Sequence, residues 1–207
     1  MAWIYKKTND NKHRFALGEV DKNPGKLLFC FGINPSTATP TSLDPTVKHI
    51  KEISQAHGYN SWVMLNVCSQ RATDPNKMDD EQKEILHSKN LKIISRLLKQ
   101  HSDNSDILFA YGDLINKKPY LEKNLCEIIN IIKKTNYSGK CYCLGKTKSG
   151  NPRHPLYQKT NTAFVTFSLD GHTYSEIFYL EDNKCAIREY AENGDLILET
   201  FGVCKSK

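Results

Sequence analysis

Residues 27–40 read LLFCFGINPSTATP, and these residues are the strongest indication of the fold. It begins with a run of apolar residues that ends at Gly32 and continues into the polar turn NPST at residues 34–37. A short apolar run closed by glycine and proline is typical of a buried β-strand. In open α/β sheets, ligands bind beyond the carboxyl ends of the strands, where the following helix also points its N-terminus. We therefore expect the functional site beside residues 34–37.

Length, charge and cysteine content limit the class of protein. The 207 residues suffice for one domain with a substantial core. The formal net charge of +6 permits a polyanionic partner, although an ordinary soluble surface explains it equally well. Seven cysteines without regular disulfide spacing favour free thiols, and no apolar segment resembles a secretion signal or a membrane span. We expect a cytoplasmic protein with no membrane partner, and the oligomeric state stays open.

Strand and helix signals alternate on both sides of the central stretch. Two short β-like runs at 3–5 and 15–20 precede it and are joined by a polar loop. After it, apolar periodicity predicts helices at 42–59, 80–100 and 120–134 and strands at 62–67, 107–112 and 140–145. This alternation predicts a three-layer α/β/α fold with a central parallel sheet and right-handed crossovers.

The first of these helices has a clear start signal. Asp44 suits the N-cap and Pro45 the first helical position, while Gly58 ends the apolar periodicity. The capping role explains Asp44 fully, and a catalytic carboxylate is the minority alternative.

The end of the chain has a different pattern. Short alternating runs are separated by the turn dipeptides Asp170-Gly171, Asp182-Asn183 and Asn193-Gly194, and the runs themselves lie at 163–169, 174–180, 185–190 and 196–201. This pattern predicts an antiparallel β meander. We expect an α/β domain over residues 1–160 and a β-rich C-terminal extension over residues 161–207.

Polar residues follow three of the predicted strands, at 34–37, 66–71 and 153–157. They carry amides, hydroxyls, a guanidinium and an imidazole, without a strong nucleophile or a Ser-His-Asp or Cys-His order. Amides read the edges of planar heterocycles well, because each offers a donor and an acceptor. An imidazole near such an edge can stabilise the charge that develops on a leaving base. These residue types favour the recognition of a nucleobase.

Four segments resemble the uracil-DNA glycosylase superfamily, in the same order along the chain. GINPS at 32–36 resembles the water-positioning segment of its mismatch-specific branch, and MLNVCSQRA at 64–72 resembles the strand with the uracil-recognising asparagine. FAYGD at 109–113 resembles the next strand, and RHPLY at 153–157 resembles the His-Pro-Ser loop. The resemblance implies a glycosylase-like α/β/α domain.

A closer resemblance is to an uncharacterised bacterial and phage family, a domain of unknown function that is grouped with the glycosylase-like fold. The segments that carry this resemblance are INPSTA at 33–38, DPT at 44–46, RATDP at 71–75 and KSGNPRHPLY at 148–157. The resemblance spans about residues 1–160, so it does not include the predicted meander.

The resemblance to glycosylases implies roles for particular residues. Asn34 would position a water molecule, and His154 would stabilise the departing base, so these two form the expected catalytic pair. Asn66 would read an edge of the base, with Ser36 and Arg71 as further base-binding residues.

The same resemblance implies a DNA-binding surface near the end of the α/β domain. Leu156 or Tyr157 would fill the gap that a flipped nucleotide leaves in the duplex. The cations Lys146, Lys148 and Arg153 would contact phosphates.

This chain departs from the glycosylase pattern at three positions. The best-known glycosylases have aspartate where Asn34 stands, and an amide cannot act as a carboxylate base. Ser36 replaces a glycine, and Leu156 replaces the serine that follows His-Pro. The resemblance thus implies the glycosylase fold more strongly than the glycosylase reaction.

We expect a DNA glycosylase-like enzyme that hydrolyses the N-glycosidic bond of a damaged, mismatched or modified base by base flipping, without a metal or other cofactor. The alternative is a catalytically weak binding module for a nucleotide, nucleobase or modified base, in phage defence or signalling. A third possibility is a transferase or hydrolase that acts on a nucleotide-derived small molecule.

Each of these candidate site residues, considered by itself, also has a purely structural explanation. The two asparagines could cap turns, the imidazole and the cations could belong to a solvated loop, and Arg71 could pair with Asp74. Cys141 and Cys143 would share one face of a strand and, with His154, suggest zinc. A zinc site usually needs four ligands, so we do not expect one.

Overall fold

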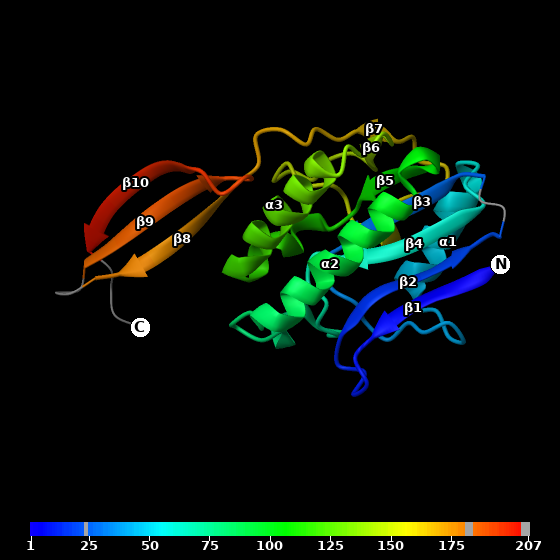
Figure 1. Cartoon of the computed structure of the whole chain (residues 1–207), viewed down its shortest axis with the longest axis horizontal. Helices are drawn as coiled ribbons and strands as arrows, with labels where there is room; N and C mark the ends of the chain where they lie inside the picture. Colours follow the sequence, from blue (N-terminus) through cyan, green and yellow to red (C-terminus); the bar gives the residue numbers. More distant parts are fainter. Residues whose placement is uncertain (23–24, 181–183, 204–207) are drawn as a thin grey trace.

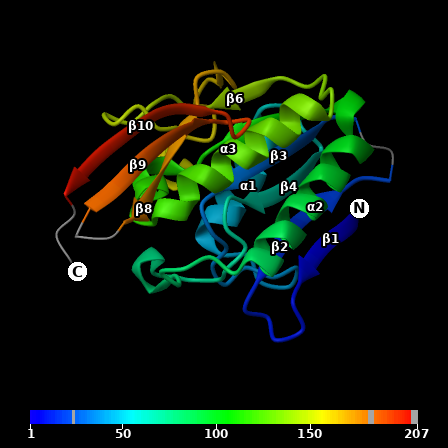
Figure 2. The same cartoon turned by 60° about the vertical axis from the view of Figure 1, so that its left-hand side comes forward.

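The computed structural model of the chain describes residues 1–22, 25–180 and 184–203. These residues form a seven-stranded sheet and a separate three-stranded sheet (Figures 1 and 2). The strands of the large sheet are β1 (Ala2–Lys7), β2 (Arg14–Val20), β3 (Leu27–Gly32), β4 (Ser61–Asn66), β5 (Ser105–Phe109), β6 (Cys141–Cys143) and β7 (Val165–Thr166). They lie side by side in the order β1-β2-β4-β3-β5-β6-β7.

Four parallel strands, in the order β4-β3-β5-β6, form the centre of the large sheet. All residues of β3 and β4 are buried, which is the pattern of strands covered on both faces. The expected central parallel sheet is therefore confirmed. The hairpin β1-β2 extends one edge in antiparallel orientation, and the short β7 extends the other.

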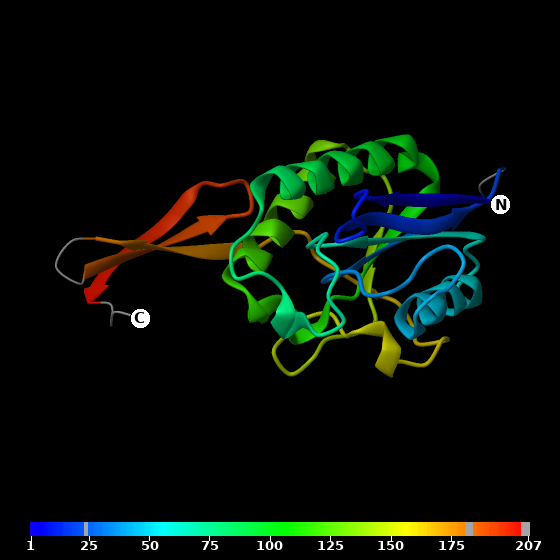
Figure 3. The same ribbon diagram turned by 90° about the horizontal axis from the view of Figure 1, so that it is seen from below.

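Three helices cover the two faces of this sheet. Helix α1 (Pro45–Ala56) lies on one face, and helices α2 (Glu84–Gln100) and α3 (Pro119–Lys134) lie on the other (Figure 3). Each face has its own apolar cluster, one built around α1 and the other around α2 and α3. Apolar burial on both faces holds the three layers together, as the sequence predicts.

The start of α1 follows its sequence signal. Pro45 is the first helical residue, and the Asp44 side chain accepts a hydrogen bond from the backbone N–H of Val47 at 2.9 Å. Gly58 follows the helix with a φ of +77°, a conformation that glycine adopts without strain. The capping role of Asp44 is therefore confirmed.

The predicted start of α2 at residue 80 is wrong, because the helix begins at Glu84. Two carboxylates in the preceding segment bind partners outside the helix. Asp79 pairs with Lys83 at 2.9 Å, and Asp80 pairs with Lys118 of the loop before α3 at 2.6 Å. The chain bends at residues 80 and 81 of this segment before the helix begins, which periodicity alone does not reveal.

The C-terminal part confirms the meander but moves its first strand. The run at 163–169 supplies β7, which pairs with β6 in the large sheet and not with the meander. The meander consists of β8 (Thr173–Tyr179), β9 (Lys184–Ala191) and β10 (Leu196–Val203). Gly171 and Gly194 turn the chain with φ values of +80° and +91°, whereas Asp182-Asn183 lies outside the described residues.

The meander lies beyond α3, at the left of Figure 1. Lys133 at the end of α3 pairs with Asp170 at 2.8 Å and with Glu192 at 2.6 Å. The Lys123 ammonium group also lies 5.9 Å from the centre of the Tyr174 ring. Charged and cation–π contacts therefore join the three-stranded sheet to the α/β domain.

The structure also bears on the expectations about free thiols, membrane-spanning helices and metal sites. Cys185 is disulfide-bonded, so the expectation of free thiols is wrong there, whereas the free thiols are those of Cys30, Cys68, Cys126, Cys141 and Cys143. Within the described ranges, no helix combines the length and apolar character that a membrane crossing requires. These same ranges contain no group of three or more His, Cys, Asp or Glu side chains placed to hold a metal ion, the Cys141–Cys143–His154 set included.

Candidate functional site

The connectivity of the parallel strands marks one place for a ligand. From β3 the chain crosses to β4 on one side of β3 and then to β5 on the other side. A crevice forms beyond the carboxyl ends of the strands at such a reversal, and ligands of open α/β sheets bind there. The segment after β3, residues 34–37, lies at this crevice.

A cavity of about 380 Å³ occupies the crevice, within the range of small-molecule pockets of about 300–1,000 Å³. The first residues of α1, the end of β3, Tyr111 shortly after β5 and the loop around His154 all contribute to its wall. The lining residues with functional groups are Arg14, Asn34, Ser36, Thr37, Asp44, Thr46, Thr73, Tyr111 and His154. We refer to this space as the site cavity.

Asn34 presents one free acceptor at this wall. Its Nδ2 donates to the carbonyl oxygen of Ala72 at 2.8 Å and to that of Pro35 at 3.1 Å, which fixes the orientation of the amide. Within the described part of the chain, no donor reaches the Oδ1 atom. This oxygen is therefore available to a water molecule or a ligand.

His154 presents a donor to the same cavity. It caps the short helix η4 (Pro155–Tyr157), where its Nδ1 accepts from the backbone N–H of Leu156 at 3.4 Å. The ring proton is therefore assigned to Nε2. Burial lowers the pKa of His154, against a smaller opposing effect of Asp44, so the ring is neutral at neutral pH. A neutral Nε2–H suits an oxygen on which negative charge develops.

Asp44 lines the cavity as well as capping α1. Its Oδ1 binds the N–H of Val47, and its Oδ2 accepts from the N–H of Ala38 at 3.3 Å. Among the described residues that line the cavity, Asp44 carries the sole carboxylate. A carboxylate in such a place can accept a proton as well as fix a helix end.

Asn66 lies beside the cavity floor but outside its lining. It pairs with Gly32 in the sheet register, and a Cβ at Gly32 would lie 3.1 Å from the Asn66 Nδ2 and 2.6 Å from the Met64 Cε. The Asn66 Oδ1 accepts from Arg14 at 3.4 Å, while its buried Nδ2 has no partner among the described residues. Only its donor is thus left to a ligand.

Ser36 lines the cavity, whereas Arg71 lies behind the loop that carries Ser36. The Arg71 guanidinium donates to the carbonyl oxygens of Ser36 and Ala38, the latter at 3.2 Å, and to the Tyr5 hydroxyl at 3.0 Å. Asp74 does not line the cavity either and caps the short helix η1 (Pro75–Lys77). Arg71 thus shapes the wall without facing the interior.

The predicted DNA-binding residues lie on one side of the site cavity. Leu156 lines it and is 40% exposed, while Tyr157 is 81% exposed, which is high for residues of this size. A second hollow of about 470 Å³ continues from His154 and is lined by Tyr157, Arg153 and Lys117. The two hollows share Tyr111, Leu114 and His154 as lining residues and therefore lie next to each other, and we refer to them together as the groove.

The loop with the other predicted phosphate contacts is ordered by Asp113. The Asp113 carboxylate accepts from the Thr147 hydroxyl at 2.7 Å and from the Asn151 amide at 2.8 Å. The side chains of Lys146, Lys148 and Arg153 are exposed on this loop. They are therefore open to an anionic partner.

Arg14 is a cavity residue that the sequence patterns did not predict. This residue begins β2, lines the site cavity and is 1% exposed. A charged residue at the head of the otherwise apolar run RFAL was the available signal, but strand patterning alone places such a residue at an ordinary strand end.

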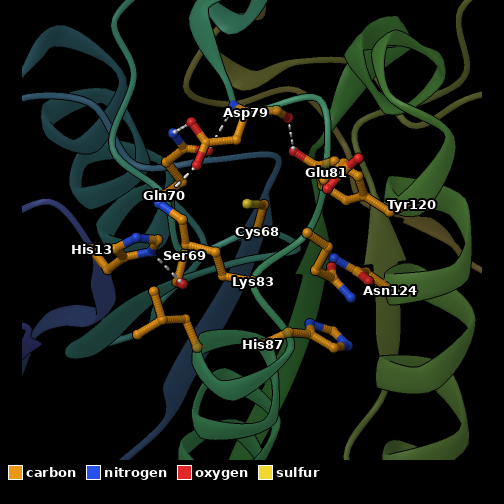
Figure 4. A pocket seen from close by; sticks show the side chains of 12 residues that line it. His13, Cys68, Ser69, Gln70, Asp79, Glu81, Lys83, His87, Tyr120 and Asn124 are labelled. Carbon is orange, nitrogen blue, oxygen red and sulfur yellow. Dashed lines mark hydrogen bonds and ion pairs between the residues drawn. The ribbon is translucent and has the colours of Figure 1, made fainter.

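A second, smaller chamber lies between the loop after β4 and the helices α2 and α3 (Figure 4). Gln70 and Asp79 bind each other there through two hydrogen bonds of 2.9 and 3.0 Å, and the Tyr120 hydroxyl donates to the Asp79 carbonyl. The volume of about 20 Å³ holds a single water molecule. The chamber is too small for a nucleobase, so the site cavity is the candidate functional site.

Comparison with known proteins identifies a family. Residues 14–156 match the profile of a family described as "Protein of unknown function (DUF1643)". No curated protein and no solved structure shows significant similarity to the chain. The matched range runs from Arg14 to Leu156, both of which line the site cavity, and it excludes the meander. Because the match extends over more than half of the sequence, the chain belongs to the DUF1643 family.

Proposed function

We propose that this protein is a DNA glycosylase-like hydrolase that cleaves the N-glycosidic bond of a damaged, mismatched or modified base. The observation that carries the proposal is the meeting of Asn34 and His154 in one base-sized cavity at the reversal of strand order. Asn34 offers a free acceptor oxygen, and His154 offers a neutral N–H donor. These are the groups needed for an attacking water molecule and a leaving base.

The proposed reaction assigns a task to each group. A water molecule held by the Asn34 Oδ1 attacks the sugar carbon, and the electron pair of the N-glycosidic bond leaves with the base. The His154 Nε2–H donates a hydrogen bond to the base oxygen on which the charge collects. Asp44 accepts the proton of the water and then returns it to the free base, which supplies the carboxylate that position 34 lacks.

The groove beside the cavity supports DNA as the substrate. A base inside a duplex reaches a buried pocket only after it has been flipped out, and an exposed apolar side chain can fill the gap. Leu156 and Tyr157 lie at the right place for that task, with Arg153 next to them for a phosphate.

Base release tests this proposal directly. Purified protein is incubated with single-stranded and duplex DNA that carries uracil, mismatched thymine or modified pyrimidines, and free base is measured by mass spectrometry. We expect release from at least one substrate and its loss in Asn34→Ala. The control is Asn161→Ala, because Asn161 is exposed and lies outside the lining of both hollows of the groove. Absence of release from every DNA contradicts the proposal.

One observation favours a binding module as the second candidate. The amide of Asn34 is fixed by a backbone carbonyl. At this position near β3 the cavity wall therefore carries a hydrogen-bonding group, whereas a hydrolase would gain more from a general base such as a carboxylate. Such a cavity recognises a nucleotide or modified base without turning it over. A nucleotide that co-purifies with the protein and binds without chemical change would support this candidate.

A further inference from the structure

Arg14 has an unusual position for a charged residue. Only 1% of its surface is exposed, and its side chain lines the site cavity. Burying a guanidinium costs several kcal/mol or more unless an anion or a full set of acceptors compensates for the lost water. The partners of Arg14 therefore decide how its charge is held.

The described partners of Arg14 are neutral and few. Its Nη1 donates to the carbonyl oxygen of Ala38 at 3.2 Å, and its Nη2 donates to the Asn66 Oδ1 at 3.4 Å. The buried Nε has no acceptor among the described residues. A guanidinium has five N–H donors, so most of its hydrogen-bonding capacity is unused.

The charges nearby do not neutralise Arg14 by contact. Arg71 donates to the same Ala38 oxygen, which brings a second cation close. Burial and the Arg71 charge lower the pKa of Arg14 to about 10, and Asp44 acts in the opposite direction. Among the described residues, no carboxylate oxygen lies within ion-pair distance of Arg14. The cavity thus contains a buried cation without a paired anion.

We propose that Arg14 binds an anionic oxygen group of the ligand that fills the site cavity. The proposal deepens the glycosylase proposal, on which it rests for the ring of the ligand, by adding a charged substituent to the substrate class. A guanidinium matches a planar carboxylate or a phosphate through two parallel hydrogen bonds. The unpartnered Asn66 Nδ2 next to Arg14 adds a further donor for the same oxygens.

The anionic oxygen has two chemical sources. It can belong to a carboxylate on an oxidised nucleobase, or it can belong to the 5′-phosphate of a nucleotide. Two matched pairs of small ligands separate the sources: uracil against 5-carboxyuracil, and 2′-deoxyuridine against its 5′-monophosphate. Within each pair the ring is constant and one anionic group is added.

Isothermal titration calorimetry of these four compounds on the full chain provides the test. We expect the anionic member of at least one pair to bind about tenfold more tightly or better, because hydrogen bonds to charged groups are the strong ones. Arg14→Gln should abolish this gain in affinity. Arg14→Lys keeps the charge but cannot form the two parallel hydrogen bonds of a guanidinium, so it should retain part of the gain. Lys48→Gln is the control, because it removes one exposed positive charge from α1.

The outcomes separate cleanly. A gain in the uracil pair identifies a base carboxylate, and a gain in the nucleoside pair identifies a phosphate. Equal affinities within both pairs on the unaltered protein overturn the inference, even where Arg14→Gln fails to fold. So does a gain that survives in folded Arg14→Gln or that disappears equally in Lys48→Gln.

The measurement does not depend on catalysis. Release of base from DNA with equal affinities in both pairs would leave the glycosylase proposal intact and remove the role of Arg14. A gain for the anionic ligands without any base release would support the role of Arg14 and contradict the enzyme.

Discussion

The small chamber and the larger site cavity of the α/β domain differ in size and in the partners of their polar groups. In the small chamber below α2 and α3, Gln70 and Asp79 satisfy each other through two hydrogen bonds, while the buried amide of Asn124 has no partner among the described residues. In the site cavity beside α1, Asn34 and Arg14 each keep hydrogen-bonding atoms that no described residue uses. Polar groups that satisfy each other stabilise a fold, whereas unsatisfied groups around a larger space are typical of a ligand site.

The sharpest way to test this contrast is to remove the cavity carboxylate without removing the cap. Asparagine caps helices as well as aspartate does, so Asp44→Asn should keep the hydrogen bond from the Val47 N–H, lose the longer one from the Ala38 N–H and lower the melting temperature only slightly. We expect base release to fall by about 10²–10⁴-fold, the usual contribution of a general base. Asp74→Asn at the start of η1 is the matched control, and equal activity of the two variants would remove Asp44 from the reaction.

His154→Ala should give the next largest effect. We expect base release to fall by about 10²-fold, because the Nε2–H donor to the leaving base is lost. Since burial lowers the pKa of His154 in the folded state, the unfolded chain binds more protons as pH falls through about 6.5.

The free energy of unfolding should therefore decrease with falling pH, and His154→Ala should reduce that slope without abolishing it. His13 and His101 contribute to the same slope, because burial lowers their pKa values too. Urea titrations between pH 5 and pH 8 would measure it. A slope identical in the variant and the parent protein would contradict a buried neutral His154.

Tyr157→Ala probes the rim of the site cavity. Because the side chain is 81% exposed, its removal should leave the melting temperature unchanged. We expect DNA affinity to fall by about tenfold, which corresponds to one lost stacking contact. Fluorescence anisotropy with labelled DNA would measure it. Ile85→Ala on α2 serves as the control, because Ile85 is also exposed and lies outside the lining of both hollows of the groove.

Gln70→Ala tests the small chamber and should have the smallest effect. The change leaves the Asp79 backbone N–H without its acceptor and should cost about 1–2 kcal/mol of stability. Base release per folded molecule should not change, because the chamber holds only one water molecule. A loss of activity beyond the loss of folded protein would mean that the small chamber and the site cavity are coupled.

Local patterns in the sequence predicted much of the fold. The apolar run of β3 and the Asp44-Pro45 signal are local features, and the structure confirms both. The predicted start of α2 was wrong because Asp80 binds Lys118, a residue distant in sequence. The predicted place of residues 163–169 in the meander was wrong for the same kind of reason, since these residues pair with β6, a strand distant in sequence.

The residues predicted for the candidate site also differ in whether local sequence patterns place them correctly. Asn34, Ser36, His154 and Leu156 lie in segments that follow predicted strands, the resemblance to glycosylases implied their roles, and all four line the site cavity. Asn66 ends β4 and Arg71 follows it, but Asn66 turns to Arg14 and Arg71 turns to the loop carbonyls. The positions of strand ends follow from sequence patterns, whereas the direction of a buried polar side chain depends on its partners.

The carbonyl oxygen of Ala38 accepts from both Arg14 and Arg71, at 3.2 Å in each case. This one main-chain atom ties the loop after β3 to the edge hairpin and to the segment after β4. The loop is consequently ordered before any ligand arrives, so little conformational entropy is lost at the moment of binding. Association should then proceed in one kinetic phase, with affinity differences between related ligands expressed mainly in their residence times.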